Sequence, residues 1–313
     1  MEISKIKQVL ADPTVFQINR LPARSSHRYY ATLEEAKKGE EMPWRKCLNG
    51  TWKFHYRENL DNAPADSEIT GEIKVPGHIQ MQGYGKPHYT NTMYPWDGHE
   101  EIIPPAIPTG FNPVGTYVKE FEIPETWGTQ DVCICFEGVE TAVNVWLNGH
   151  YVGYSEDTFT PSRFDLTPYI NRSGVNILKI EVYRYSTASW LEDQDFWRFS
   201  GIFRDVYLET KPAAHINDIH VRTDLFDNYT RAIVTVKYDT DGAAASGETR
   251  ARLYDKNGME IAGDSYAFEV TNPFLWSAEH PNLYTLEIEV LENGKVVEAI
   301  CQTIGIREFK MID

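Results

Sequence analysis

Residues 142–155 read AVNVWLNGHYVGYS, and this stretch indicates the fold of the chain more directly than any other. Two segments with a period of two lie on either side of Asn148-Gly149. Both central positions of a two-residue hairpin turn need positive φ, which Asn and Gly adopt readily. The stretch therefore predicts two antiparallel strands joined by a tight turn.

The same period of two recurs between residues 48 and 212. Further strands are expected at GTWKFHYR (50–57), GTYVKEFEI (115–123), DVCICFEG (131–138), NILKIEVYRY (176–185) and FRDVYLET (203–210). Many short strands without a long amphipathic helix are typical of a β-sandwich. Residues 76–113 differ, because Pro, Gly and aromatic residues replace the alternation. We expect a long, functional loop region there.

A second block of strands covers residues 213–308. Six or seven strands are expected in it, with hairpin turns at 256–258 (KNG) and 292–294 (ENG). This size and strand number predict an immunoglobulin-like sandwich.

Residues 1–47 form an irregular N-terminal arm in this interpretation. Short helices are expected near residues 3–10 and 32–38, and Thr32 and Glu35 have the spacing of a capping box. Two hypotheses stay open for the arm. It either crosses to another subunit or runs as a strap over its own sandwich.

Composition narrows the functional classes. The 313 residues include 46 acidic and 30 basic side chains, for a net charge of −16, so neither nucleic acid nor an anionic membrane is an expected partner. No apolar run reaches the roughly 18 residues of a membrane span, and MEISKIKQVLADP does not resemble a signal peptide. The four cysteines lack metal-site spacing, which predicts free, buried thiols in a cytoplasmic protein.

Residues 191–201, LEDQDFWRFSG, concentrate three carboxylates, one guanidinium and three aromatic rings. Neighbouring carboxylates on a strand or loop diverge, so we expect no self-contained catalytic pair here and interpret Glu192 and Asp193 as structural. From spacing alone, Asp195 is best explained by a salt bridge to Arg198 or Arg204.

Six segments, taken in order, resemble the N-terminal half of bacterial β-galactosidases of glycoside hydrolase family 2. They are DPTVFQINRLPARS (12–25), LNGTWKFHY (48–56), VPGHIQMQGYGKPHYTNTMYP (75–95), GVETAVNVWLNGHYVGYSEDTFTPSRFDLT (138–167), LEDQDFWRFSGIFRDV (191–206) and NPFLWSAEHPNLYTLEIEV (272–290). The segment at 191–206 favours β-galactosidases over the related β-glucuronidases and β-mannosidases.

The resemblance implies an all-β chain made of a sugar-binding jelly-roll β-sandwich (48–212) followed by an immunoglobulin-like β-sandwich (213–308). Residues 309–313 would begin the linker to a catalytic (β/α)8 barrel, which needs about 250 residues and is absent from this chain. Retaining glycosidases use two carboxylates, and in this family both lie on barrel strands. We therefore expect an N-terminal fragment of a β-galactosidase that is inactive alone and has no catalytic residue of its own.

The resemblance also assigns two site residues. Asn91 matches an asparagine that hydrogen-bonds galactose, although the residues alone favour an Asx-turn there. Asp195 matches an aspartate that contacts both a sodium ion and the galactosyl 6-hydroxyl. This sodium site would be partial, and the magnesium sites of the family lie mainly on the barrel. The aromatic residues expected to pack around Asp195 are Trp190, Phe196, Trp197 and Phe199.

The full-length enzyme would hydrolyse terminal β-D-galactosides such as lactose and would form a cytoplasmic homo-oligomer. Two alternatives stay open. The chain could be a stand-alone carbohydrate-binding module, whose flat aromatic faces would stack on galactose. It could also be the non-catalytic subunit of a multi-chain glycosidase.

Overall fold

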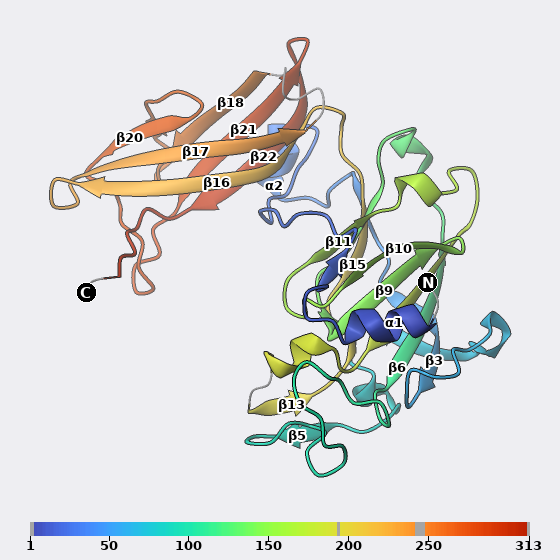
Figure 1. Ribbon diagram of the computed structural model, residues 1–313. Coiled ribbons are helices and arrows are strands. Elements are labelled where there is room, and N and C mark those ends of the chain that lie inside the picture. Colours follow the sequence, from blue (N-terminus) through green and yellow to red (C-terminus); the bar gives the residue numbers. More distant parts are fainter. Residues whose placement is uncertain (1–2, 193–194, 242–247, 312–313) are drawn as a thin grey trace. The chain divides into compact units, whose positions relative to one another are not determined.

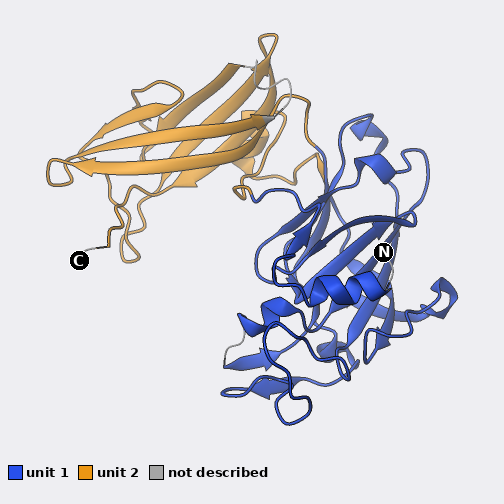
Figure 2. Cartoon of the chain, viewed as in Figure 1, with its two compact units in different colours: residues 1–23, 46–210 blue, residues 24–45, 211–313 orange. Residues whose placement is uncertain are grey.

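The computed structural model describes residues 3–192, 195–241 and 248–311. The chain divides into two compact units, shown in blue and orange in Figure 2. Unit 1 comprises residues 1–23 and 46–210, and unit 2 comprises residues 24–45 and 211–313. Strands dominate both units, and the described residues form open sheets without a (β/α)8 barrel. The predicted all-β class is confirmed.

Unit 1 is a sandwich of two main sheets. The seven-stranded sheet has the order β1 (Gln17–Ile18), β10 (His150–Ser155), β9 (Ala142–Leu147), β12 (Asn176–Tyr183), β6 (Val114–Phe121), β3 (Gly50–Arg57) and β4 (Gly71–Val75). The four-stranded sheet has the order β11 (Ser162–Asp165), β7 (Cys133–Phe136), β15 (Val206–Glu209) and β2 (Arg45–Cys47). Pairing between neighbours in the seven-stranded sheet is antiparallel throughout.

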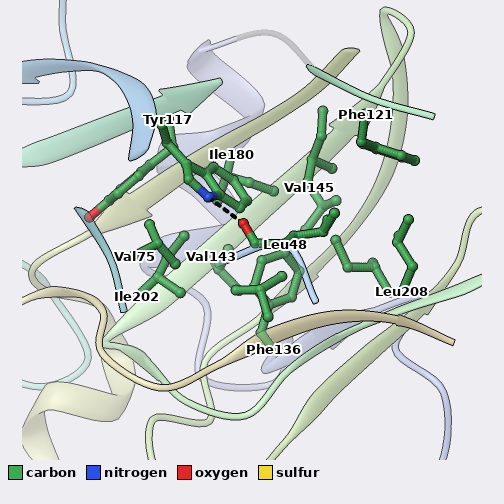
Figure 3. Close-up of a cluster of buried hydrophobic side chains, with 14 of the residues drawn as sticks. Leu48, Val75, Tyr117, Phe121, Phe136, Val143, Val145, Ile180, Ile202 and Leu208 are labelled. Carbon is green, nitrogen blue, oxygen red and sulfur yellow. Dashed lines mark hydrogen bonds between the residues drawn. The ribbon is translucent and has the colours of Figure 1, made fainter. Parts of the chain in front are cut away.

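The core of unit 1 lies between these two sheets (Figure 3). Alternate residues of β9, including Val143 and Val145, are buried in it together with Phe136 of β7. The buried Trp52 indole N–H donates a hydrogen bond to the Leu48 carbonyl at 2.8 Å, so this ring has a partner for its polar atom.

The hairpin predicted from Asn148-Gly149 is confirmed. Leu147 pairs with His150 across the turn, and the turn residues have φ values of 51° and 80°. The Asn148 amide also donates to the Tyr169 carbonyl at 2.8 Å, which joins the turn to a neighbouring loop.

The segment expected as one arm, residues 1–47, divides between the units. Helix α1 (Ile3–Leu10) packs against unit 1, and β1 extends the seven-stranded sheet. Helix α2 (Leu33–Lys38) belongs to unit 2 and begins with the predicted Thr32–Glu35 capping box. The backbone of Tyr30 exchanges hydrogen bonds of 2.9 and 2.8 Å with that of Ala299. Residues 1–23 thus follow the strap hypothesis, whereas residues 24–45 complete the second sandwich.

Unit 2 is a smaller sandwich. One sheet has the order β16 (His215–Phe226), β17 (Arg231–Asp241) and β20 (Ala267–Thr271); the other has the order β19 (Glu260–Ile261), β18 (Glu248–Tyr254), β21 (Tyr284–Glu292) and β22 (Lys295–Ile304). Both predicted hairpin turns occur, one between β18 and β19 and the other between β21 and β22.

The region 76–113 is less irregular than predicted. It contains a 3-10 turn, η2 (Gln80–Gln82), and strand β5 (His88–Thr90), which pairs with β13 (Phe196–Arg198). A second small ribbon joins β14 (Gly201–Ile202) to β8 (Val139–Glu140). The remaining 3-10 turns are η1 (Asp66–Glu68), η3 (Glu125–Trp127), η4 (Thr167–Tyr169) and η5 (Thr187–Trp190).

The cysteines are free, as predicted, but only Cys135 is buried, and Cys47 is exposed. Ile134 and Phe136 of β7 take the core positions, so the alternating cysteines lie on the opposite face of that strand. A search of the described helices found none with the length and apolar character of a membrane-spanning segment.

Candidate functional site

The ribbon of β5 and β13 brings the two predicted site residues to the same place. Figure 1 shows the two strands side by side, and their last pair at one end is Phe196 with Thr90. Asp195 directly precedes Phe196 and Asn91 directly follows Thr90, so both residues lie next to this last pair. Both side chains are exposed. Two residues far apart in the sequence therefore share one end of one ribbon.

Asp195 is oriented by its neighbour on β5. The Tyr89 hydroxyl donates a hydrogen bond to Asp195 Oδ1, and this bond is the main reason that the pKa of Tyr89 is raised. Among the described residues, no ion pair links Asp195 with Arg198 or Arg204, so the salt-bridge interpretation is wrong. Arg204 instead donates to the Phe159 carbonyl at 2.7 Å.

Asn91 makes a local hydrogen bond, but to the next residue and not two residues on, as an Asx-turn would require. Its Oδ1 accepts the backbone N–H of Thr92 at 2.9 Å. Within the described parts of the chain, no acceptor is paired with the Asn91 amide N–H groups. The local bond thus fixes the side chain through its acceptor and leaves two donors for a hydroxyl group. The local bond and a ligand role are compatible at this residue.

The exposed surface beside these polar groups is aromatic. Tyr89 and Trp197 pair across the ribbon with ring centroids 5.6 Å apart, and their exposed fractions are 49% and 52%. Trp197 stacks on Phe199 at 6.2 Å, and Phe199 stacks on His78 at 4.6 Å. The carboxylate of Asp195 therefore lies beside a half-exposed row of flat rings.

The other predicted aromatic residues pack beneath this surface. Trp190 contacts the rings of Tyr94 at 4.5 Å and of buried Trp96 at 4.7 Å, and its indole N–H donates to the Ala106 carbonyl. Phe196 lies under the Arg198 guanidinium, 4.5 Å from its ring centroid. The Trp190 contacts join the segment that precedes β13 to the segment that follows β5.

A buried charged cluster lies behind the ribbon. A cavity of about 20 Å³ is lined by the ionisable side chains Glu140, Arg184, Glu192 and Arg198, among others. Burial raises the pKa of both Glu140 and Glu192 to about 7, and the charge of Glu192 adds to the rise at Glu140. Asp193 lies outside the described residues.

This pair of carboxylates cannot serve as the catalytic pair of a glycosidase. A cavity of about 20 Å³ has room for about one water molecule, not for a sugar ring. Glu192 Oε2 accepts the Thr158 hydroxyl at 2.8 Å, which fits the structural role predicted for it. The sequence did not single out Glu140 or Arg184, because in GVETAV and EVYRY they resemble ordinary polar strand residues.

The donors for a cation are few. Among the residues that the structure describes, no three His, Cys, Asp or Glu side chains gather in a group able to hold a metal ion. Asp195 offers carboxylate oxygen, which suits a hard cation, but it would be one ligand of several. The described residues at this end of the ribbon thus offer one carboxylate for a hard cation.

Solved structures of glycosidases have a similar fold. A β-glycosidase from Bacteroides vulgatus has a TM-score of 0.63 and 24% identity, with 85% of this chain and 34% of that chain covered. A β-glucuronidase from an uncultured Clostridium sp. has a TM-score of 0.62 and 20% identity, with 87% of this chain and 46% of that chain covered. At these identities the likeness is one of fold.

Curated relatives are closer in sequence. The chain is 50% identical to a β-galactosidase of Halalkalibacterium halodurans over 97% of its own length and 32% of that protein. It is 47% identical to a β-galactosidase of Clostridium acetobutylicum, covering 97% of this chain and 36% of that one. A β-galactosidase large subunit of Latilactobacillus sakei is 39% identical, with 98% of this chain and 53% of that subunit covered. The chain thus spans about a third of the β-galactosidases and about half of the large subunit.

Family models agree with the two sandwiches. The model for the sugar binding domain of glycosyl hydrolases family 2 matches residues 45–212. A second model, for glycosyl hydrolases family 2, matches residues 214–307. With these matches across most of its length, the chain belongs to glycoside hydrolase family 2.

Proposed function

We propose that this chain is the N-terminal part of a retaining β-galactosidase, in which the β5–β13 ribbon forms one wall of the galactose pocket. The observation that carries the proposal is the pairing of Phe196 with Thr90, which brings their chain neighbours Asp195 and Asn91 to the same end of the ribbon. An amide donor and a carboxylate acceptor, side by side and exposed, suit two hydroxyl groups of one sugar. Curated relatives named β-galactosidase support the choice of substrate.

In this proposal the chain contributes binding and orientation. Asn91 donates to a galactose hydroxyl, and Asp195 accepts from the 6-hydroxyl while ligating a sodium ion with one oxygen. Tyr89 keeps the Asp195 carboxylate in place. The nucleophile, the acid/base carboxylate, the remaining sodium ligands and the magnesium sites would come from a barrel outside these residues.

The test compares the 313-residue chain with a protein extended to include a barrel encoded downstream. We expect the extended protein to hydrolyse a chromogenic β-galactoside and to release β-galactose first, as retention requires. We expect no turnover from the 313-residue chain. Turnover by this chain above that of an Asp195→Ala control, or an inactive extended protein, would contradict the proposal.

One observation favours a second candidate, a carbohydrate-binding module. The half-exposed rings of Tyr89 and Trp197 offer a stacking surface next to polar groups. Calorimetry of the 313-residue chain with galactose and lactose separates the two. Sub-millimolar affinity supports the module, and the absence of measurable heat supports a wall that binds sugar only when the pocket is complete.

The assembly and location of the whole protein form a further part of the proposal. We expect a cytoplasmic homo-oligomer, and four free thiols fit a reducing compartment. Light scattering of the extended protein tests the oligomer, and cell fractionation tests the location.

A further inference from the structure

We propose that Arg184 is a positioning residue for the sugar-binding ribbon: its guanidinium holds the two chain segments that lead into and out of β5–β13, and so sets where Asn91 and Asp195 lie. This inference rests on the proposed function for its role in sugar recognition. The anchoring itself stands on hydrogen bonds, burial and register.

Arg184 is firmly attached to the sandwich core. It directly follows β12, a central strand of the seven-stranded sheet. The residue is only 2% exposed. Its backbone N–H donates to the Pro113 carbonyl at 3.0 Å, and its carbonyl accepts the Thr141 hydroxyl at 2.8 Å. The base of this side chain is therefore fixed by neighbours on two sides.

The guanidinium extends from this base to the ribbon. Nη2 donates to the Arg198 carbonyl at 2.7 Å and lies 3.4 Å from the Lys86 carbonyl. Arg198 is the last residue of β13, and Lys86 precedes β5 by two positions. One nitrogen atom thus contacts both segments at the end of the ribbon opposite Asn91 and Asp195.

The ribbon depends on such anchors because it is small. It has only three residue pairs, and an isolated two-stranded ribbon is marginal in water. Near its other end, Arg198 Nε donates to the Thr90 hydroxyl at 3.2 Å. Arg198 therefore links the strands to each other, whereas Arg184 links both of them to the core.

Glu140 belongs to the same buried cluster. It lines the same cavity as Arg184 and is 9% exposed. Its own backbone pairs with Gly201 in the β8–β14 ribbon. The Arg184 side chain thus holds Arg198, and the backbone of Glu140 pairs with Gly201, three residues further along the same segment.

The first experiment measures amide hydrogen exchange in the 313-residue chain. Arg184→Gln should increase exchange in β5 and β13 by about tenfold or more and leave β9 unchanged. Arg172→Gln is the matched control, because Arg172 also donates to two backbone carbonyls, Gly128 at 2.7 Å and Gln130 at 2.9 Å, away from the ribbon. Unchanged ribbon exchange in a folded Arg184→Gln variant overturns the anchoring.

A second variant covers the case in which Arg184→Gln does not fold. Arg184→Lys keeps the charge but replaces the planar fork with a single ammonium group. We expect a folded variant whose ribbon alone exchanges faster than in the parent chain. Ribbon exchange equal to that of the parent overturns the proposal.

The second experiment concerns recognition in the barrel-containing protein. Arg184→Lys should lower kcat/KM about tenfold for a β-galactoside and only about twofold for its 6-deoxy analogue, because the displaced Asp195 would serve the 6-hydroxyl. In a protein that already carries Asp195→Ala, Arg184→Lys should lower kcat/KM only slightly further. Equal losses of kcat/KM for both sugars overturn the positioning role. Fully additive effects of Arg184→Lys and Asp195→Ala on kcat/KM also overturn it. If the parent protein lacks galactosidase activity, the proposed function fails, while the exchange experiment still decides the anchoring.

Discussion

The hydroxyl of Tyr89 donates a hydrogen bond to Asp195 from the opposite strand of the ribbon. The bond joins the exposed aromatic surface to the carboxylate beside it. The ring that could stack on a sugar and the oxygen that could accept its hydroxyl are thereby held at a fixed relative position.

This bond makes the ionisation of Tyr89 a probe of Asp195. The pKa of Tyr89 is raised mainly because its hydroxyl donates a hydrogen bond to the carboxylate of Asp195. Asp195→Ala should lower the pKa of Tyr89 toward its ordinary value, which NMR titration of ring-labelled tyrosine can measure. Tyr229→Phe, at an exposed tyrosine of unit 2, is the control and should leave the Tyr89 titration unchanged.

Asn91 and Asp195 should differ in their dependence on sodium. In the barrel-containing protein, either alanine substitution should raise KM for a β-galactoside by about tenfold or more, since each removes a hydrogen bond to substrate. Only Asp195→Ala should abolish the response of KM to sodium, because a carboxylate ligates a hard cation. Kinetics with sodium replaced by choline distinguish the two variants. A sodium response that survives in Asp195→Ala would contradict the assignment.

Glu140 should make the chain less stable as pH rises. Its pKa is raised from 4.5 to about 7 in the folded chain, so the folded state binds more protons than the unfolded state between these values. Stability from this group is present below pH 4.5 and is lost as pH rises through about 7. The loss is on the order of 2 to 3 kcal/mol.

Urea unfolding at pH 5 and pH 8 measures this effect. Glu140→Gln should reduce the decline in unfolding free energy between the two pH values. Glu72→Gln, at an exposed position on β4, should retain the full decline. An unchanged decline in Glu140→Gln would show that other groups cause it.

Two glycines with positive φ should differ in their tolerance of alanine. At Gly201, with φ of 125°, a Cβ atom would lie 2.9 Å from the Gly77 carbonyl oxygen and 3.1 Å from the Ile79 nitrogen. At Gly149, with φ of 80°, the space is open. Chemical unfolding should show a cost of about 1 kcal/mol for Gly149→Ala and about 3 kcal/mol or more for Gly201→Ala. Equal costs would mean that the neighbours of Gly201 move aside.

Local patterns predicted much of the fold. The Asn148-Gly149 turn and the Thr32–Glu35 cap each depend on a few consecutive residues, so sequence alone identifies them. The strand over residues 50–57 was predicted with its observed bounds, because its alternation reflects one buried face.

The site was harder to predict. Strand β5 has only three residues, and its partner β13 lies far along the chain. No local sequence pattern therefore predicts the ribbon. The resemblance supplied Asn91 and Asp195 but not their register. Arg184 and Glu140 were not predicted as site residues. The burial of a charged residue depends on partners that lie far apart in the sequence.

The pairing of Tyr30 with Ala299 has a consequence for biosynthesis and for protein engineering. Because residues 24–45 complete the second sandwich, that sandwich cannot close until the ribosome has made the last of its strands. A single cut after residue 210 would separate β22 from its Tyr30 partner and leave an unpaired sheet edge, a surface prone to aggregation. Expressing the second sandwich alone would need residues 24–45 grafted back onto it, for example through a circularly permuted gene.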